Sequence, residues 1–253
     1  MAEGSKVFTV MVVGDNPDEL MAKYDINLKV DKYCKYRYLD AEKIRNKSIK
    51  LIEEILINKD NLNLGKFQLD FFTEKLKEIK EMSDFEYYQE ITYGLTYDEN
   101  GDAWSDENQN GKWLTCKIGD FLSVPLILKN GETTHQASNK DIVWDDIHMR
   151  DSELYDITWD LVHGYREPIN EQEKKIFENM KNMKNYFSNF KTKDDYVIHN
   201  CAYWNFAYLD KNGWIDMDSC DDSTKWISQY FDTFISKLSP TDKITIYECT
   251  KEK

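Results

Sequence analysis

The amino-acid sequence predicts an α+β fold whose two ends meet in one sheet. Three observations indicate this: a β-rich run opens the chain, a hairpin, a helix and a strand close it, and amphipathic helical segments occupy much of the chain between them. Because 41% of the 253 residues are hydrophobic and 14% are aromatic, the chain carries enough apolar surface for a large core. We therefore expect most of it to fold.

The N-terminal segment reads as a strand followed by a helix. Residues 7–13 are apolar and rich in β-branched side chains. Gly14 then makes a turn, and Pro17 stands where a helix begins, with Asp18 and Glu19 in the first turn. Proline and acidic side chains both favour that end of a helix, the latter because of its positive dipole.

The C-terminal part reads as a hairpin, a helix and a last strand. Residues 201–209 and 214–217 are β-rich and flank an Asn-Gly pair, which is a strong signal for a tight hairpin turn. Apolar residues recur at helical spacing over 224–238 and a proline follows, so a helix should end there. Residues 243–249 alternate as a strand does.

Together the two ends give the order β-α, a long interruption, then β-β-α-β. This is the order of a ferredoxin-like split β-α-β unit. It predicts that residues 6–13 and 243–249 lie side by side and antiparallel, in one sheet with the 201–217 hairpin. The predicted division is a ferredoxin-like domain of residues 1–38 and 196–253, and an inserted region of residues 39–195.

The predicted insertion is helical at both ends and β-rich in its middle. Apolar residues recur at helical spacing over 41–57 and 66–82. Ser83 precedes Glu86 by three residues, which is the spacing of a capping box for a third helix. The predicted parts are helical residues 39–93 and 151–190, the latter split into 151–162 and 170–190, and a small β part over 94–150.

The net charge of −14 is concentrated in three stretches. Residues 94–111 contribute −5, residues 141–160 contribute −6 and residues 210–222 contribute −4, so the rest of the chain is nearly neutral. Because no basic stripe is present, direct nucleic-acid binding is disfavoured. A partner protein with a basic surface is the better electrostatic match.

Five cysteines are scattered along the chain, and no two of them form a C-x-x-C pair. They are Cys34, Cys116, Cys201, Cys220 and Cys249. This pattern indicates reduced thiols in a cytoplasmic protein and predicts no disulfide. No run approaches the roughly 18 apolar residues that a membrane helix needs, so no membrane partner is expected.

Two acidic clusters resemble metal-binding loops. A calcium loop that begins at Asp98 needs Gly at its sixth position and Glu at its twelfth, where the chain has Ala103 and Gln109. The second cluster, over 216–222, reads as an acidic turn between a strand and a helix, with a weak Ca²⁺ or Mg²⁺ site as the alternative. We therefore expect no cofactor and no metal.

The common nucleophile, phosphate-binding and zinc motifs are absent from the sequence. His199 and Cys201 stand two residues apart, and on a strand their side chains would share a face. A thiolate–imidazole pair is therefore one interpretation. The more common arrangement is a histidine at a hairpin edge and a cysteine in the core.

Three tryptophans, Trp104, Trp113 and Trp144, fall in the predicted β region beside acidic residues. Such rings can stack on a base or anchor a partner protein, although core packing is the more common use of tryptophan. This region is the place where the sequence would put a nucleotide-like ligand.

One segment resembles a family of uncharacterised phage and bacterial proteins. Asn108, Asn110, Lys112 and Trp113 match a pattern that reads roughly N-P-N-x-K-W in the family. Ile118 and Gly119 match the start of the I-G-G-R-W that follows it. The chain also resembles the family over 8–24, 202–214 and 246–249, but it has Gln109 in place of the proline and lacks the arginine. The resemblance implies a phage origin and a shared fold, with no known activity.

We therefore expect a phage-encoded, non-enzymatic binding or inhibitory protein that acts in the cytoplasm on a host protein, such as a defence protein, through its acidic surfaces. The alternatives are a protein that sequesters a nucleotide-like small molecule and a metal-assisted enzyme. The predicted binding residues are Trp104, Lys112, Trp113, Asp145, Asp146, Asp216, Asp218 and Asp221.

Overall fold

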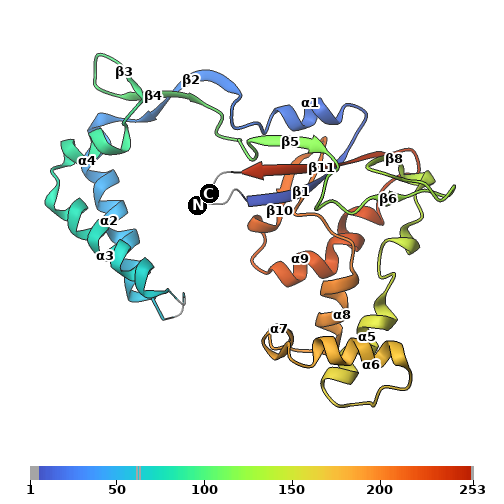
Figure 1. Ribbon diagram of the computed structural model, residues 1–253. Helices are drawn as coiled ribbons and strands as arrows, with labels where there is room; N and C mark the ends of the chain where they lie inside the picture. Colours follow the sequence, from blue (N-terminus) through green and yellow to red (C-terminus); the bar gives the residue numbers. More distant parts are fainter. Residues whose placement is uncertain (1–5, 61, 63, 252–253) are drawn as a thin grey trace. The chain divides into compact units, whose positions relative to one another are not determined.

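The computed structural model describes residues 6–60, 62 and 64–251 (Figure 1). Its elements are mixed α and β, with several sheets. The described chain forms two compact units, one of the residues up to Leu28 and from Gln109 onward, the other Lys29–Asn108. The predicted domain boundaries at residues 39 and 195 stay a prediction.

The larger unit is built on one mixed sheet. Its strands are β1 (Lys6–Val13), β5 (Thr115–Ile118), β8 (Gln136–Ser138), β9 (Ala207–Asp210), β10 (Gly213–Asp216) and β11 (Lys243–Lys251). The order is β10-β9-β1-β11-β5, and β8 also pairs with β11. β1 and β11 run antiparallel, from the Lys6 and Lys251 pair to the Val13 and Ile244 pair. The predicted pairing of the two terminal strands in one sheet with the hairpin is therefore confirmed.

The strand order of a ferredoxin-like sheet is not confirmed. A split β-α-β unit would place β10 between β1 and β9, whereas β9 lies directly beside β1 and parallel to it. Burial explains the order, because all three residues of 207–209 are buried and suit a strand covered on both faces. β10 leaves Ile215 46% exposed and therefore suits the edge of the sheet. β5 and β8, which come from the predicted insertion, also pair with β11.

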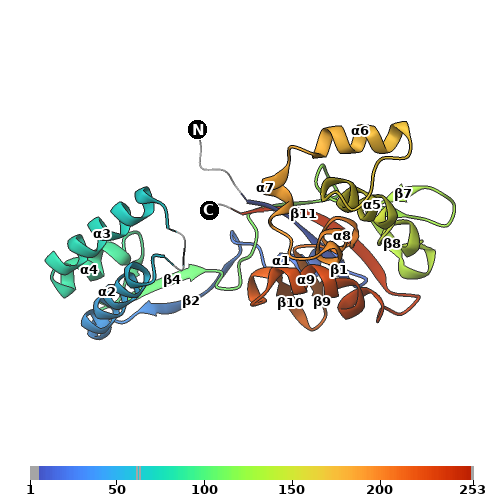
Figure 2. The same ribbon diagram turned by 90° about the horizontal axis from the view of Figure 1, so that it is seen from below.

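Helices lie on both faces of this sheet, above and below it in the view of Figure 1, and Figure 2 looks onto the lower of these faces. α1 (Pro17–Ala22) places Met21 against Val10 and Val12, in a core that also holds Phe8 and Leu209. The opposite face packs Met11, Ile244 and Ile246 against α9 (Ser223–Tyr230). The α-helix predicted over 224–238 ends earlier, at Tyr230, and the chain continues as a π-helical turn at Phe231–Ile235.

A separate helical cluster follows in the same unit. It contains α5 (Ser152–Val162), α6 (Glu171–Met180), α7 (Lys184–Phe187) and α8 (Lys193–Cys201). Its core is formed by Trp159, Phe187, Tyr196, Val197 and Cys201. The single helix predicted over 170–190 is instead two, α6 and α7. Asn170 caps α6, because its side chain accepts the backbone N–H of Glu173.

The two-stranded hairpin β6 (Leu126–Ile127) and β7 (Thr133–Thr134) completes the larger unit.

Within the part of the chain that the structure describes, no helix is long and apolar enough to cross a membrane.

The smaller unit combines a helical hairpin with a short sheet. Its elements are β2 (Lys29–Tyr36), α2 (Ala41–Ile57), α3 (Lys66–Glu81), α4 (Asp84–Ile91), β3 (Thr96–Tyr97) and β4 (Ala103–Glu107), with the sheet order β2-β4-β3. Ser83 and Glu86 form the predicted capping box of α4. Tyr88 joins helix and sheet, because its buried hydroxyl accepts the N–H of Ala103 and shares its one O–H between the carbonyl oxygens of Tyr36 and Gly101.

Candidate functional site

A groove runs between α5 and α8 of the helical cluster, with a volume of about 590 Å³. Its apolar lining residues are Met149, Ile157, Val197 and Ile198. Its acidic lining residues are Glu153, Asp156 and Asp194, and Ser152 completes the set. Two residues of the acidic stretch 141–160, Glu153 and Asp156, therefore place negative charge beside an apolar surface.

Helical spacing explains why these side chains meet. On α5, Glu153 and Ile157 are four residues apart, and on α8, Asp194 and Ile198 are four apart, so each pair lies on one helix face. The two helices pack against each other. Thr192 begins α8 with a capping box, in which its hydroxyl accepts the N–H of Asp195 at 3.1 Å.

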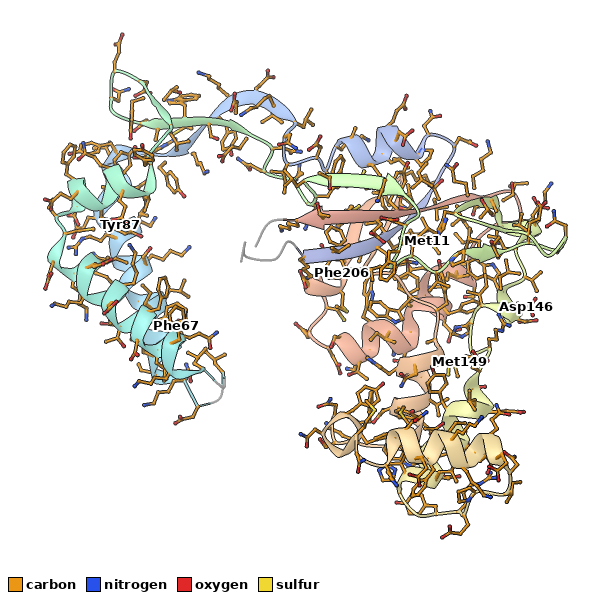
Figure 3. All side chains as sticks on the ribbon, viewed as in Figure 1. Met11, Phe67, Tyr87, Asp146, Met149 and Phe206 are labelled. Atoms are coloured by element: carbon orange, nitrogen blue, oxygen red, sulfur yellow. The ribbon has the colours of Figure 1, made fainter. Side chains whose placement is uncertain are left out.

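Met149 connects the groove to the chain that precedes α5 (Figure 3). Its φ of 61° makes it the one non-glycine residue with a positive φ in the described part of the chain. Its N–H donates to the carbonyl oxygen of Cys201 at 2.8 Å, at the end of α8. Such a backbone costs energy and persists only where surrounding contacts hold it. The flexible thioether that it presents suits a surface that adapts to a partner.

The groove is electrostatically negative. Lys193 pairs with Asp156 and Asp160, at 2.9 Å in each case, and so neutralises part of the rim. Glu153 and Asp194 are exposed and form no ion pair among the described residues. Asp145 and Asp146 are also exposed, in a 3-10 turn at Trp144–Asp146 that lies three residues before Met149 in the chain.

Three predicted site residues, Lys112, Asp216 and Asp218, come together at a second place, beside the ends of β1 and β10. All three line one pocket. The Asp216 carboxylate, with 9% of its side chain exposed, accepts Lys112 Nζ at 3.2 Å and Trp214 Nε1 at 2.8 Å. Its other oxygen accepts the N–H of Ser219 at 3.0 Å.

These contacts determine the role of Asp216. Burial alone would raise the pKa of this carboxyl group, but the bonds from Trp214 and Lys112 outweigh it and hold the pKa below the ordinary value of 3.8. Asp216 is therefore an ionised anchor with both oxygens occupied. Asp221 is exposed in the loop that follows. Within the described ranges, no three His, Cys, Asp or Glu side chains are grouped as metal ligands.

The structure places Trp113 and Trp144 on opposite faces of the sheet of the larger unit, and Trp104 in the smaller unit. Trp113 packs with the core on the α1 face of the sheet, and its Nε1 donates to the Met21 carbonyl at 3.2 Å. Trp144 packs on the opposite face, and its Nε1 donates to Asn139 at 2.8 Å. Trp104 belongs to the smaller unit, where its Nε1 donates to Asp98 at 3.1 Å. Core packing, the more common use of tryptophan, describes Trp113 and Trp144.

The proposed pairing of His199 with Cys201 is also corrected. Both lie on α8 and not on a strand, so a spacing of two residues turns their side chains to different faces. Cys201 is buried, and burial raises the pKa of its thiol to about 11. His199 is exposed beside Phe190, with ring centroids 5.1 Å apart. No thiolate–imidazole pair forms here.

Sequence reasoning missed Met149, Val197 and Ile198 as site residues. The signal for α8 was present, since Thr192 and Asp195 have capping-box spacing, but the β-rich reading of the following residues obscured it. It also missed the lysines that line the second pocket with Lys112, namely Lys6 and Lys251.

Comparison of the chain with protein-family models, curated proteins and solved structures gives no match.

Proposed function

We propose that this chain is a non-enzymatic binding protein that takes up a basic, partly apolar segment of a partner protein in the groove between α5 and α8. The observation that carries the proposal is an apolar floor of Ile157, Val197 and Ile198 beside two exposed carboxylates, Glu153 and Asp194, that form no ion pair among the described residues. A segment with an apolar side chain flanked by lysine or arginine is complementary to this arrangement.

The two parts of the groove would contribute differently to binding. Burial of apolar side chains on the floor stabilises the complex by about 25 cal/mol per Å² removed from water, less the cost of ordering. Exposed carboxylates at the rim act mainly on the association rate and on the choice of partner. The groove would therefore distinguish a basic amphipathic segment from an acidic one even where their apolar areas are equal.

Two further statements belong to this proposal and start from the sequence. The resemblance to phage and bacterial proteins supports a phage-encoded chain, and a host protein is then the partner that we propose it inhibits. The scattered cysteines, all of them free thiols in the structure, support action in the cytoplasm.

The test is capture of partners from an extract of the natural host by the intact chain, followed by binding kinetics with the purified partner. The E153Q/D194N variant removes two rim charges and keeps the shape of each side chain. We expect it to lower the association rate and to weaken its salt dependence. The D70N/E74Q variant is the matched control, because Asp70 and Glu74 are exposed acids on α3 of the smaller unit.

A partner whose association rate ignores both salt and E153Q/D194N would contradict the use of this groove. The M149S variant tests the apolar lining of the groove separately, because Met149 also lines it. It should raise the dissociation rate with little change in association, because the thioether would contact the partner only in the formed complex.

A further inference from the structure

A pocket of about 510 Å³ lies at the ends of β1, β10 and β11, within the larger unit and outside the α5–α8 groove. Its charged lining residues are Lys6, Lys112, Lys251, Asp216 and Asp218. Its apolar wall is formed by Phe8, Phe206 and Trp214, and Ser219 completes the set. Three lysines in one pocket are unexpected in a chain with a net charge of −14.

Strand register places two of these lysines opposite each other. Lys6 on β1 and Lys251 on β11 are Cα partners in the antiparallel ladder, so their side chains leave the same face of the sheet. Like charges at directly opposite positions destabilise a sheet. Further along the same face the residues are apolar, since Phe8 is paired with Cys249. The lysine pair therefore costs stability where apolar side chains would contribute to it.

The carboxylates in the pocket neutralise only part of the positive charge of the three lysines. Lys6 Nζ lies 3.4 Å from Asp218, and the two side chains are 42% and 68% exposed, so this ion pair is weak and easily exchanged. Lys251 forms no ion pair with any carboxylate of the described residues. Lys112 is held by the buried Asp216, but an ammonium group has three donors and can give another to a ligand.

The aromatic wall is fixed in position beside the lysines. Trp214 lines the pocket and is half-buried, so part of its side chain is exposed, and the hydrogen bond from its Nε1 to Asp216 holds the indole in place. Lys6 Nζ lies 4.1 Å from the centroid of the Phe206 ring, which places an ammonium group directly beside the apolar wall. A ligand with a planar ring and an anionic group would satisfy both parts at once.

We propose that this pocket binds a nucleoside phosphate, with the base against Trp214 and the phosphate between Lys6 and Lys251. The volume lies within the roughly 300–1,000 Å³ of pockets that enclose small ligands. A free nucleotide fits better than a nucleic-acid strand, because the acidic surface elsewhere on the chain repels a long polyanion. This site is independent of the α5–α8 groove and does not rest on its function.

The experiment is equilibrium dialysis of the intact chain against adenosine 5′-monophosphate at low salt, with adenosine and inorganic phosphate as separate arms. We expect the nucleotide to bind at least tenfold more tightly than either part alone, and its affinity to fall as salt is added. Inorganic phosphate that binds as tightly as the nucleotide would overturn the nucleoside assignment. No binding of the nucleotide at millimolar concentration would overturn the site.

The K6Q/K251Q variant locates the binding. We expect at least a tenfold loss of nucleotide affinity, with an unchanged circular dichroism spectrum. The matched control is K237Q/K243Q, which removes the same charge from exposed positions outside the pocket, Lys243 being at the other end of β11. Equal losses in the two variants would show a general charge effect and overturn the proposed site.

Discussion

The backbone N–H of Tyr203 donates a hydrogen bond to Nδ1 of His148, with 3.1 Å between the two nitrogens. The imidazole also stacks on Phe231, with ring centroids 4.1 Å apart and 11° between the planes. A protonated imidazole has donors on both nitrogens and cannot accept this bond. His148 is therefore neutral when the loop that precedes α5 is docked on the sheet core.

This contact predicts that stability falls in mildly acidic solution. Burial lowers the pKa of His148 below its ordinary value of 6.5, although Asp232 and Asp145 oppose the shift. Because the folded-state pKa is the lower one, the unfolded chain takes up the proton first. The contribution of His148 to the free energy of unfolding is therefore fully present above pH 6.5 and declines as the pH falls below it. Urea unfolding between pH 8 and 5 measures this, and H148Q, which keeps an acceptor but does not titrate, should flatten the decline.

The sheet illustrates what local sequence can and cannot predict. β1 and β11 were predictable because the pattern of apolar side chains along each strand and the elements next to it in the chain are local features of the sequence. The pairing of the two terminal strands then follows from the order of the elements. The position of β9 was not, because a hairpin can join the sheet by either strand. Residues 207–209 are all buried, which means that both faces of β9 are covered, and this burial places β9 inside the sheet and β10 at its edge.

The same limit applies to the sites. Lys6, Lys112 and Lys251 are distant in sequence and stand in no motif, so strand register alone brings them together. Asp216 was predicted as a site residue from a local acidic cluster. The structure adds that Trp214, two residues earlier on β10, donates a hydrogen bond to it.

We predict that D216N destabilises the protein by about 1–3 kcal/mol, because the Asn side chain loses the charged bond from Lys112 and part of the bonding to Trp214 and Ser219. The pKa of Asp216 is lowered, so its contribution is present above the ordinary pKa of 3.8 and is lost as pH falls below it. Denaturant unfolding at pH 7 tests the cost. D221N, at an exposed position, should change stability by less than about 0.5 kcal/mol.

Two buried tyrosines should respond oppositely to loss of their hydroxyl groups. The Tyr88 hydroxyl accepts the N–H of Ala103 and shares its O–H between the carbonyl oxygens of Tyr36 and Gly101, so Y88F should cost about 1–3 kcal/mol. The Tyr196 hydroxyl is buried and has no hydrogen-bond partner among the described residues. Y196F should therefore be neutral or slightly stabilising. Thermal unfolding of both variants tests this prediction. A large loss of stability in Y196F would show that the Tyr196 hydroxyl is hydrogen-bonded in solution.

Cys201 should be a poor nucleophile in the folded protein. Burial, with a smaller contribution from Asp151, raises the pKa of its thiol to about 11. The rate of alkylation by iodoacetamide should therefore be low at pH 8 and should increase with pH up to about 11. Peptide mapping after timed labelling measures it for this residue alone. The urea-unfolded chain is the control, in which Cys201 should react with the ordinary thiol pKa of 9.

The last prediction separates two sets of exposed aspartates that the sequence alone treats as equivalent. Asp145 and Asp146 form no ion pair among the described residues, and they precede Met149, which lines the α5–α8 groove. Asp218 instead pairs with Lys6 in the lysine pocket. D145N/D146N and D218N/D221N remove the same charge, so the net charge of the chain cannot distinguish them.

If the groove takes up a basic segment, D145N/D146N should slow association with the partner about two- to tenfold at low salt, because nearby charges steer the encounter. D218N/D221N should leave that rate nearly unchanged. Stopped-flow measurements at several salt concentrations test this, since the difference should vanish when the Debye length falls to about 3 Å near 1 M salt. Equal slowing by both variants would mean that the charge acts through the whole molecule and not through the groove.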